Sequence, residues 1–423
     1  MVPLEQDKGD EGGRMTTLQD VYDVYNKYLY LESTHLIDVS LATYITKDLP
    51  GKPLWMVPVG PSSYGKSTIA SFIPYLEKTD KNKYRVLSMD QMTAKGFAST
   101  AISSKAPEYG KWLENQHSLM YFSDMASLLV SEDSKNLFAM FRTLYDGDIR
   151  LTTGTAERIY ENCHVNMLGF STPKIRSNLE HMTAMGTREL VYTLPKIQNP
   201  EGMYEKNVTK EVLKEISITV KDFIDELSIK TEQPNQEIKK YLSENAEHIT
   251  IYRAEANDTE SGMLFEPVET EYPKRVYDQL VKLWNGLTLM GLLEEKKKDI
   301  IIDISRGSGT KLRRLVLLEF FGVLVLKEDN TYHQYVNLDG GGKESTIRGV
   351  SNKLSIHPKE ITREFSVLAS LGLIRAKEEY PVPVDDGYGE KTIPENTWQS
   401  FSPNTKWFGV EPKKRKKIAD MCL

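Results

Sequence analysis

A glycine-rich stretch, VGPSSYGKST at residues 59–68, constrains the fold of this chain more than any other part of the sequence. It follows the apolar run LWMVPV and leads into KSTIASFIPYLEK, where apolar residues recur at helical spacing. The pattern G-x-x-x-x-G-K-[ST] is expected by chance about once in a hundred chains of this length. The order therefore predicts a buried strand, a loop and a helix.

These loop residues have the chemistry of a phosphate-binding site. The backbone N–H groups of the loop and the positive end of the following helix would face an anion, Lys66 would reach the terminal phosphates, and Ser67 would offer its hydroxyl to Mg²⁺. The sequence thus predicts ATP and Mg²⁺ as cofactors; the alternative is a tight turn with a solvated lysine. The candidate ATP-binding residues are Gly60, Pro61, Ser62, Ser63, Tyr64, Gly65, Lys66, Ser67 and Thr68.

Length, charge and cysteine content narrow the class of protein. A chain of 423 residues is long enough for two or three domains. The net charge of −6 argues against general attraction to nucleic acid, so DNA binding would need local basic surfaces. Cys163 and Cys422 are too few for a disulfide framework or a cysteine metal site. Because no run of about 18 apolar residues occurs, we expect a soluble cytoplasmic protein without a membrane partner.

Further apolar segments predict a parallel sheet beside the loop. YRVLSMD (84–90) and SLMYFSDMASLL (118–129) are typical of a second and a third strand. Asp124 follows the apolar part of the third strand, where a carboxylate could hold Mg²⁺ through water. The alternative is that Asp124 caps the helix that follows, and both roles are compatible.

A hairpin is predicted immediately before the fourth strand, VNMLGF. The segments DIRLT and ERIYENCHV flank the turn TTGT, which puts Arg150 and Arg158 on the two arms. The fourth strand ends at Ser171 and Thr172, whose hydroxyls are suited to positioning a water near a γ-phosphate. Arg188 comes immediately before a fifth strand, ELVYTL.

In this order, the loop, the aspartate-ended strand, the hairpin and the arginine resemble AAA+ ATPases of the pre-sensor-1 hairpin group. The likeness is nearest to the minichromosome-maintenance-like helicases of phages and mobile elements. It implies that Thr172 is sensor 1 and that Arg188 is a finger entering the neighbouring subunit's site in a homo-oligomeric ring. EYPKRVYDQLVKLWNGLTLMGLL (271–293) is similar to the family's lid helix, which implies that Arg275 is sensor 2. The candidate catalytic residues are therefore Lys66, Asp124, Thr172, Arg188 and Arg275.

The sequence departs from this family in two places. Helicases of this group carry an Asp-Glu pair on the third strand, whereas Asp124 is followed by Met125, so no general base is assigned. The hairpin tip TTGT also lacks the lysine that the family uses to touch DNA. Both differences concern hydrolysis and movement rather than nucleotide binding.

The C-terminal part is similar to a winged helix. TKLRRLVLLEFF, KESTIRGVSNKLSI and HPKEITREFSVLASLGLIRA predict its three helices, followed by a wing. The third would be the recognition helix, with Lys359, Thr362 and Arg363 facing DNA. Winged helices also serve as protein-contact modules, and the later run KKRKK either grips phosphates or keeps the terminus solvated.

The expected fold class is α/β: a P-loop AAA+ core with a parallel sheet, a helical lid and a C-terminal winged-helix domain. The expected function is that of an ATP-hydrolysing, ring-forming DNA motor, a replicative helicase or helicase loader of a phage or mobile element that also meets other replication proteins. The alternatives are a non-translocating, nucleotide-switched DNA-binding initiator or regulator and, less favoured, a P-loop kinase acting on a small molecule. The expected domains are a disordered N-terminus (1–15), a helical lead-in (16–50), the core (51–198), a helical insertion and lid (199–305), a winged helix (306–392) and a basic tail (393–423).

Overall fold

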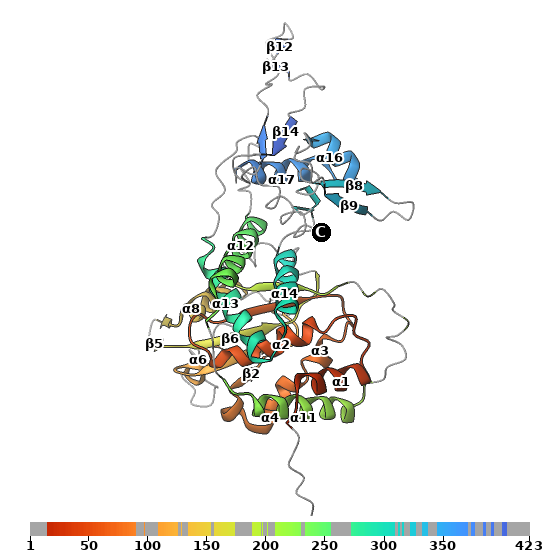
Figure 1. Cartoon of the computed structure of the whole chain (residues 1–423). Coiled ribbons are helices and arrows are strands. Elements are labelled where there is room, and N and C mark those ends of the chain that lie inside the picture. The colour runs from red at the N-terminus through yellow and green to blue at the C-terminus, as the bar shows by residue number, and fades with distance from the viewer. Residues whose placement is uncertain are drawn as a thin grey trace, which may run out of the picture. The chain divides into compact units, whose positions relative to one another are not determined.

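A computed structural model of the chain shows an α/β protein (Figure 1). The structure describes residues 15–89, 97, 109–125, 128, 134–153, 156–173, 188–195, 197, 201, 208–229, 233–254, 272–308, 312–313, 315–316, 322–326, 332–336, 345–370, 374–376, 384–385, 391–392 and 400–403. The expected disordered N-terminus up to residue 14 and the basic run 413–417 lie outside these residues.

The chain divides into two compact units. Unit 1 consists of Met1–Met185, Leu194–Gln233 and Lys282–Lys297. Unit 2 consists of Gly186–Thr193, Pro234–Val281 and Lys298–Leu423. The segment 199–305, predicted as one insertion and lid, therefore contributes to both units.

A five-stranded sheet is the main β-structure and has the strand order β2-β3-β6-β1-β7. The β1–β6, β2–β3 and β3–β6 pairs are parallel. Every residue of β1 is buried, as expected for a strand covered on both faces. The predicted α/β class is confirmed, and a strand lies in each predicted segment: β1 (Trp55–Val59), β2 (Val86–Ser88), β3 (His117–Phe122), β6 (His164–Gly169) and β7 (Leu190–Thr193). The third is shorter than predicted, because it ends at Phe122 and not at residue 129.

Helices occupy the segment predicted as a lead-in, which is part of unit 1. α1 begins with a capping box between Thr17 and Asp20, and every residue of α2 is buried in unit 1 except His35. Unit 1 contains, among its described elements, α1 (Leu18–Tyr28), α2 (His35–Ile45), the 3₁₀ helix η1 (Thr46–Asp48), α3 (Lys66–Ile69), α4 (Phe72–Tyr84), α6 (Tyr109–Leu113), α8 (Ser134–Asp146), α11 (Lys210–Glu226) and the hairpin β4 (Ile149–Thr153) with β5 (Ala156–Tyr160).

The helix after the glycine-rich loop is divided, although the sequence pattern predicts a continuous one. α3 ends at Ile69, and α4 begins at Phe72. The physical reason is Pro74, which lacks an N–H and whose ring would clash with the carbonyl of Ala70 in a continuous helix. Pro74 is tolerated where it lies, in the first turn of α4.

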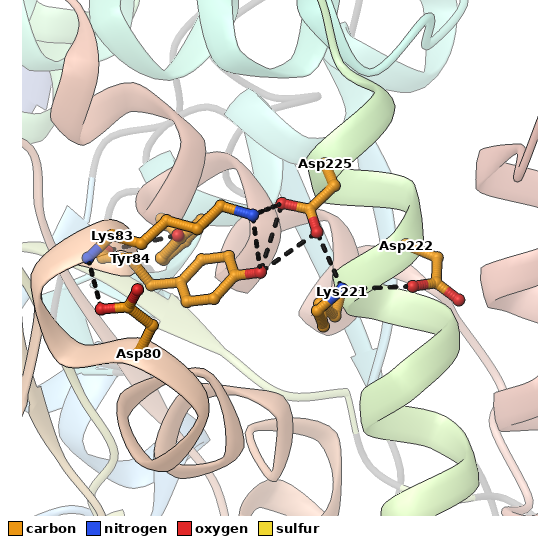
Figure 2. A network of polar contacts seen from close by, with 7 residues as sticks. Asp80, Lys83, Tyr84, Lys221, Asp222 and Asp225 are labelled. Atoms are coloured by element: carbon orange, nitrogen blue, oxygen red, sulfur yellow. Dashed lines mark hydrogen bonds and ion pairs between the residues drawn. The ribbon is translucent and has the colours of Figure 1, made fainter.

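A polar network fixes α11 to the end of α4 (Figure 2). Asp225 of α11 accepts hydrogen bonds from Lys83 Nζ at 2.9 Å, from Tyr84 OH at 3.1 Å and from Lys221 Nζ at 2.8 Å. Each such exposed pair contributes little by itself, about 0–1 kcal/mol, but one carboxylate that three donors share holds a defined geometry. The helix predicted within the insertion therefore packs on the helix that follows the loop.

The C-terminal part of unit 2 contains the second and third helices predicted for a winged helix, as α16 (Ile347–Leu354) and α17 (Pro358–Ser370). The expected domain ended at residue 392, whereas β14 (Ser400–Pro403) is the middle strand of the sheet β10-β14-β11. The other described elements here are β8 (Gly322–Leu326), β9 (Tyr332–Val336), β10 (Ser345–Thr346), β11 (Ile374–Ala376), β12 (Val384–Asp385) and β13 (Lys391–Thr392).

Three longer helices precede this part: α12 (Gln236–Arg253), α13 (Lys274–Leu289) and α14 (Glu294–Gly307). On α12, Nδ1 of His248 is buried and has no hydrogen-bond partner among the described residues. Burial lowers the pKa of His248 from 6.5 to about 4. In that range the unfolded chain binds a proton that the folded chain does not, so the free energy of unfolding falls as the pH falls from 6.5 towards 4.

Acidification from pH 7 to pH 5 is therefore expected to remove about 1–2 kcal/mol of stability through His248 alone. Urea unfolding of the wild type and of His248→Gln at both pH values measures this difference. The variant should show a weaker pH dependence, whereas His357→Gln, which changes an exposed imidazole, should keep that of the wild type. An equal pH dependence in the wild type and in His248→Gln would contradict the assignment.

In the part of the chain that the structure describes, no helix is both long enough and apolar enough to cross a membrane.

Candidate nucleotide-binding site

The carboxyl ends of β1 and β6 meet where the strand order reverses. The chain passes from β1 to β2 on one side of the sheet and from β6 to β7 on the other. Hydrogen bonds extend this junction beyond the strands: Ser171 N–H donates to Pro58 O at 3.0 Å, and Gly60 N–H donates to Ser171 O at 3.2 Å. In open α/β sheets, ligands bind at such a reversal, outside the carboxyl ends of the strands.

The glycine-rich loop begins at this junction and has two residues in the left-handed region. Gly65 has a φ of 73° and Ser63 a φ of 66°. A Cβ on Gly60 would meet side-chain atoms of Leu194 at 3.0 Å, which is closer than ordinary contact. Glycine is therefore favoured at Gly65 by its conformation, and at Gly60 a larger residue would require the Leu194 side chain to move.

The N–H groups of this loop are available to an anion. From Ser62 to Thr68, no backbone N–H donates a hydrogen bond of normal geometry to an acceptor in the described residues. The Lys66 ammonium is not simply solvated either, because it donates to Gly60 O at 2.6 Å and to Pro61 O at 2.5 Å. The loop thus presents donors and a lysine together.

Asp124 lies at the same edge of the sheet. Beyond the end of β3, Phe170 N–H donates to Phe122 O at 3.0 Å and Met125 N–H donates to Phe170 O at 2.7 Å. Asp124 is exposed between these anchors. Burial lowers the pKa of the Lys66 ammonium, and the carboxylate of Asp124 opposes that shift. The structure therefore brings Lys66 and Asp124 within electrostatic reach of each other.

The residue after Asp124 is a packing residue. Met125 is fully buried, and a Cβ on Gly169 of β6 would lie 2.1 Å from its Sδ. The side chain thus fills the space beside β6 that a glycine leaves open. A buried thioether cannot act as a general base, so the position directly after Asp124 does not supply one.

Two hydroxyl residues follow β6, and the structure distinguishes them. Thr172, predicted as sensor 1, is partly exposed. Ser171 is 1% exposed, and its Oγ has no hydrogen-bond partner among the described residues. An unbonded buried hydroxyl at the β1–β6 junction is a further candidate polar contact. The sequence contains both hydroxyls but does not reveal which one is buried.

Arg188 and Arg275 belong to unit 2, and the nucleotide loop belongs to unit 1. Arg188 directly precedes the buried Glu189 at the start of β7, and Arg275 is the second residue of α13. Both are partly exposed. Their assignments as finger and sensor 2 stay predictions.

The predicted hairpin is present as β4 and β5, and its two arginines lie on opposite faces. In the antiparallel register Arg150 pairs with Ile159 and Leu151 pairs with Arg158. Directly opposite residues share a face, so Arg150 lies with the exposed Ile159, while Arg158 lies on the face of the buried Ile149. Arg150 is exposed and Arg158 is partly buried.

The predicted DNA-contact residues of the C-terminal part lie on α17. Arg363 is exposed, whereas the Thr362 hydroxyl donates to Pro358 O at 2.9 Å within the helix. Lys359 lies in the first turn, and its side chain is outside the described part of the structure. Of the three, Arg363 is the described side chain best placed to reach a phosphate.

No protein-family model matches the chain, and the search of curated proteins finds no significant match.

Proposed function

We propose that the protein binds ATP at loop 60–68 and uses its hydrolysis to act on DNA. The observation that supports this most is the run of loop N–H groups that form no hydrogen bond of normal geometry with the described residues, next to the Lys66 ammonium and the Asp124 carboxylate. Donors, a cation and a carboxylate at a strand-order reversal are the groups that a magnesium-bound triphosphate requires.

Each residue has a distinct role in this proposal. The loop N–H groups and Lys66 hold the phosphate oxygens, while Ser67 and Asp124 hold Mg²⁺ directly or through water. When bound, Mg²⁺ offsets the charge on the phosphate oxygens. Thr172 or Ser171 orients the attacking water, and Arg188 and Arg275 contact the phosphates, with Arg188 acting on the neighbouring subunit of a ring.

The proposed action on DNA rests on two exposed arginines and on the resemblance to hairpin-bearing helicases. Arg150 extends from the exposed face of the β4–β5 hairpin, and Arg363 extends from α17. Local cations of this kind can bind a phosphate backbone although the chain has a net charge of −6. We therefore favour a ring-forming helicase or helicase loader that serves the replication of a phage or mobile element.

One observation favours a second function, a nucleotide-switched DNA-binding initiator or regulator. The buried Met125 stands where a motor of this group has its general base. Without a base, turnover would be slow, and the bound nucleotide would set the assembly state instead of driving movement.

The test that separates these functions combines two assays on the same preparation. The ATPase rate is measured alone, with single-stranded DNA and with duplex DNA, and strand displacement is measured in parallel. A motor should show DNA-stimulated turnover and ATP-dependent displacement. A switch should show nucleotide-dependent DNA binding without displacement. If neither ATP nor DNA is bound, both proposals are wrong.

The hairpin register gives a sharper prediction than the sequence alone. Arg150→Ala should remove most of the DNA stimulation and lower the salt slope of DNA binding by about one unit per subunit, because one phosphate contact is lost. Arg158→Ala is the matched control on the opposite face of the hairpin and should keep both properties. Equal behaviour of the two variants would indicate that the exposed face of the hairpin does not contact DNA.

A further inference from the structure

Two stacked histidines lie at the amino edge of the sheet in unit 1. His117 and His164 are the first residues of β3 and β6 and pair directly in parallel register. Their ring centroids are 4.7 Å apart, and the planes differ by 10°. At about 3.3 Å per residue, this edge is about 17 Å from the carboxyl ends of the same strands. The pair is therefore separate from the candidate nucleotide site.

The protonation of this pair is partly fixed by the backbone. Nδ1 of His117 lies 2.9 Å from Lys47 O, and a carbonyl can only accept a hydrogen bond. Nδ1 therefore donates this hydrogen bond, and Nε2 is the ring nitrogen that Lys47 O does not use. His164 is exposed at the same edge.

Helix α13 passes beside this histidine pair. We call the region of His117, His164, Thr46 and Lys282 the corner. A Cβ on Gly286 would come within 2.5 Å of Thr46 Cγ2, so α13 packs closely on η1. The Thr46 hydroxyl accepts from Asn166 Nδ2 at 3.0 Å, and Asn166 is two residues after His164, on the same face of β6. Lys282 is one turn before Gly286, on the same side of α13. This packing brings Lys282 beside His164.

Lys282 is a largely buried lysine. Its side chain is 6% exposed, and no described residue forms a hydrogen bond or an ion pair with its ammonium. The nearby carboxylate is Asp48, which already forms ion pairs with Lys47 and Arg85. Cations inside a fold are normally paired, and because the Lys282 ammonium is not among the fully enclosed, unbonded polar atoms, an anion can reach it from the surface.

The electrostatics of the corner agree with this arrangement. Burial lowers the pKa of Lys282 to about 8, and Asp48 opposes the shift only in part. The pKa of His164 is lowered by burial first and then by His117, Lys282 and Lys52. Lys47 and Arg85 already pair with Asp48, so the charges of Lys282 and Lys52, which both act on His164, are not offset by that carboxylate alone.

We propose that this corner is an anion site for a phosphate-type dianion, which accepts hydrogen bonds from the Lys282 ammonium and from the imidazoles of His164 and His117. A dianion would give Lys282 its missing partner and favour the charged form of both rings. Binding would therefore be accompanied by proton uptake. The inference does not depend on the proposed nucleotide site, which lies at the opposite edge of the sheet.

The experiment is a titration of the full chain with inorganic phosphate at constant ionic strength, followed by NMR through the imidazole signals of His117 and His164. We expect a saturable shift and a rise of about one unit in the pKa of His164. Lys282→Met, which keeps the length and removes the charge, should weaken phosphate binding about tenfold or more. Lys274→Met, on the same helix and paired with Asp278, is the control and should bind as the wild type does.

Two further variants keep the test decisive. Lys66→Ala should retain the shift, because the corner is independent of the nucleotide loop. His164→Gln changes an exposed residue and should fold even if Lys282→Met does not. Its phosphate binding is followed through the imidazole signals of His117 and should be weaker than that of the wild type. An unchanged affinity in His164→Gln or in a folded Lys282→Met, or an equal shift with chloride, would overturn the proposal. Competition between phosphate and a short single-stranded oligonucleotide would assign the anion to nucleic acid, and lack of competition would assign a free anion; either result supports the site.

Discussion

Replacing Lys66 by alanine is expected to reduce ATP hydrolysis by about 100-fold or more, the effect of removing a preorganised charge from a phosphoryl-transfer site. The ammonium is half-buried, donates to two loop carbonyls and lies within reach of Asp124. The substitution removes the positive charge but leaves the conformations of Gly65 and Ser63 in place. The loop should therefore persist without its cation.

The matched control is Lys83→Ala, an exposed lysine of the same unit that pairs with Asp225. It should keep the wild-type rate, because its ammonium lies in the network between α4 and α11 and not in the loop (Figure 2). Wild-type turnover in a purified Lys66→Ala protein would show that the loop is not the site of hydrolysis.

Removing Arg313 is expected to cause the largest loss of stability in unit 2, about 3–5 kcal/mol. Arg313 Nε donates to Glu364 Oε2 of α17 at 2.7 Å, and the guanidinium also donates to the carbonyls of Ile251 and Ala254 at the end of α12. Arg313 and Glu364 are 5% and 7% exposed. Alanine would leave the Glu364 carboxylate buried without its partner and two carbonyls without this donor.

Urea unfolding of the full chain measures this effect. Arg363→Ala, which truncates the exposed arginine next to Glu364, is the control and should change stability by no more than about 0.5 kcal/mol. The double variant Arg313→Met with Glu364→Leu should recover much of the loss, because an apolar pair has no charge to desolvate. A loss below about 1 kcal/mol in Arg313→Ala would show that the ion pair is not essential to the packing of α17.

The strands around the loop could be predicted from the sequence because each is a short apolar run that ends at a polar residue. Every residue of strand β1 is buried, so the strand appears in the sequence as a continuous apolar run. The position of Asp124 followed from the same pattern. The break between α3 and α4 could also be predicted from the sequence, because Pro74 disfavours a continuous helix. The helical spacing of the apolar residues, however, continues across the break.

Other features depend on register and on long-range packing. The faces of Arg150 and Arg158 are set by which residues pair across the hairpin, and a shift of one residue would exchange them. The stack of His117 on His164 requires the parallel register of two strands that are far apart in the sequence. In the sequence, Lys282 looks like an ordinary lysine on a helix surface. Only the contact of Gly286 with Thr46 in the structure shows that it lies in the corner.

Calorimetric titration of the full chain with ATP, in the presence and absence of Mg²⁺, tests the central claim most directly. The wild type should bind ATP, and Mg²⁺ should strengthen the binding by about tenfold or more. Asp124→Asn should still bind ATP but lose most of the gain from Mg²⁺, because the carboxylate is the proposed anionic ligand of the metal. Failure of the wild type to bind ATP, or an undiminished Mg²⁺ effect in Asp124→Asn, would contradict the account.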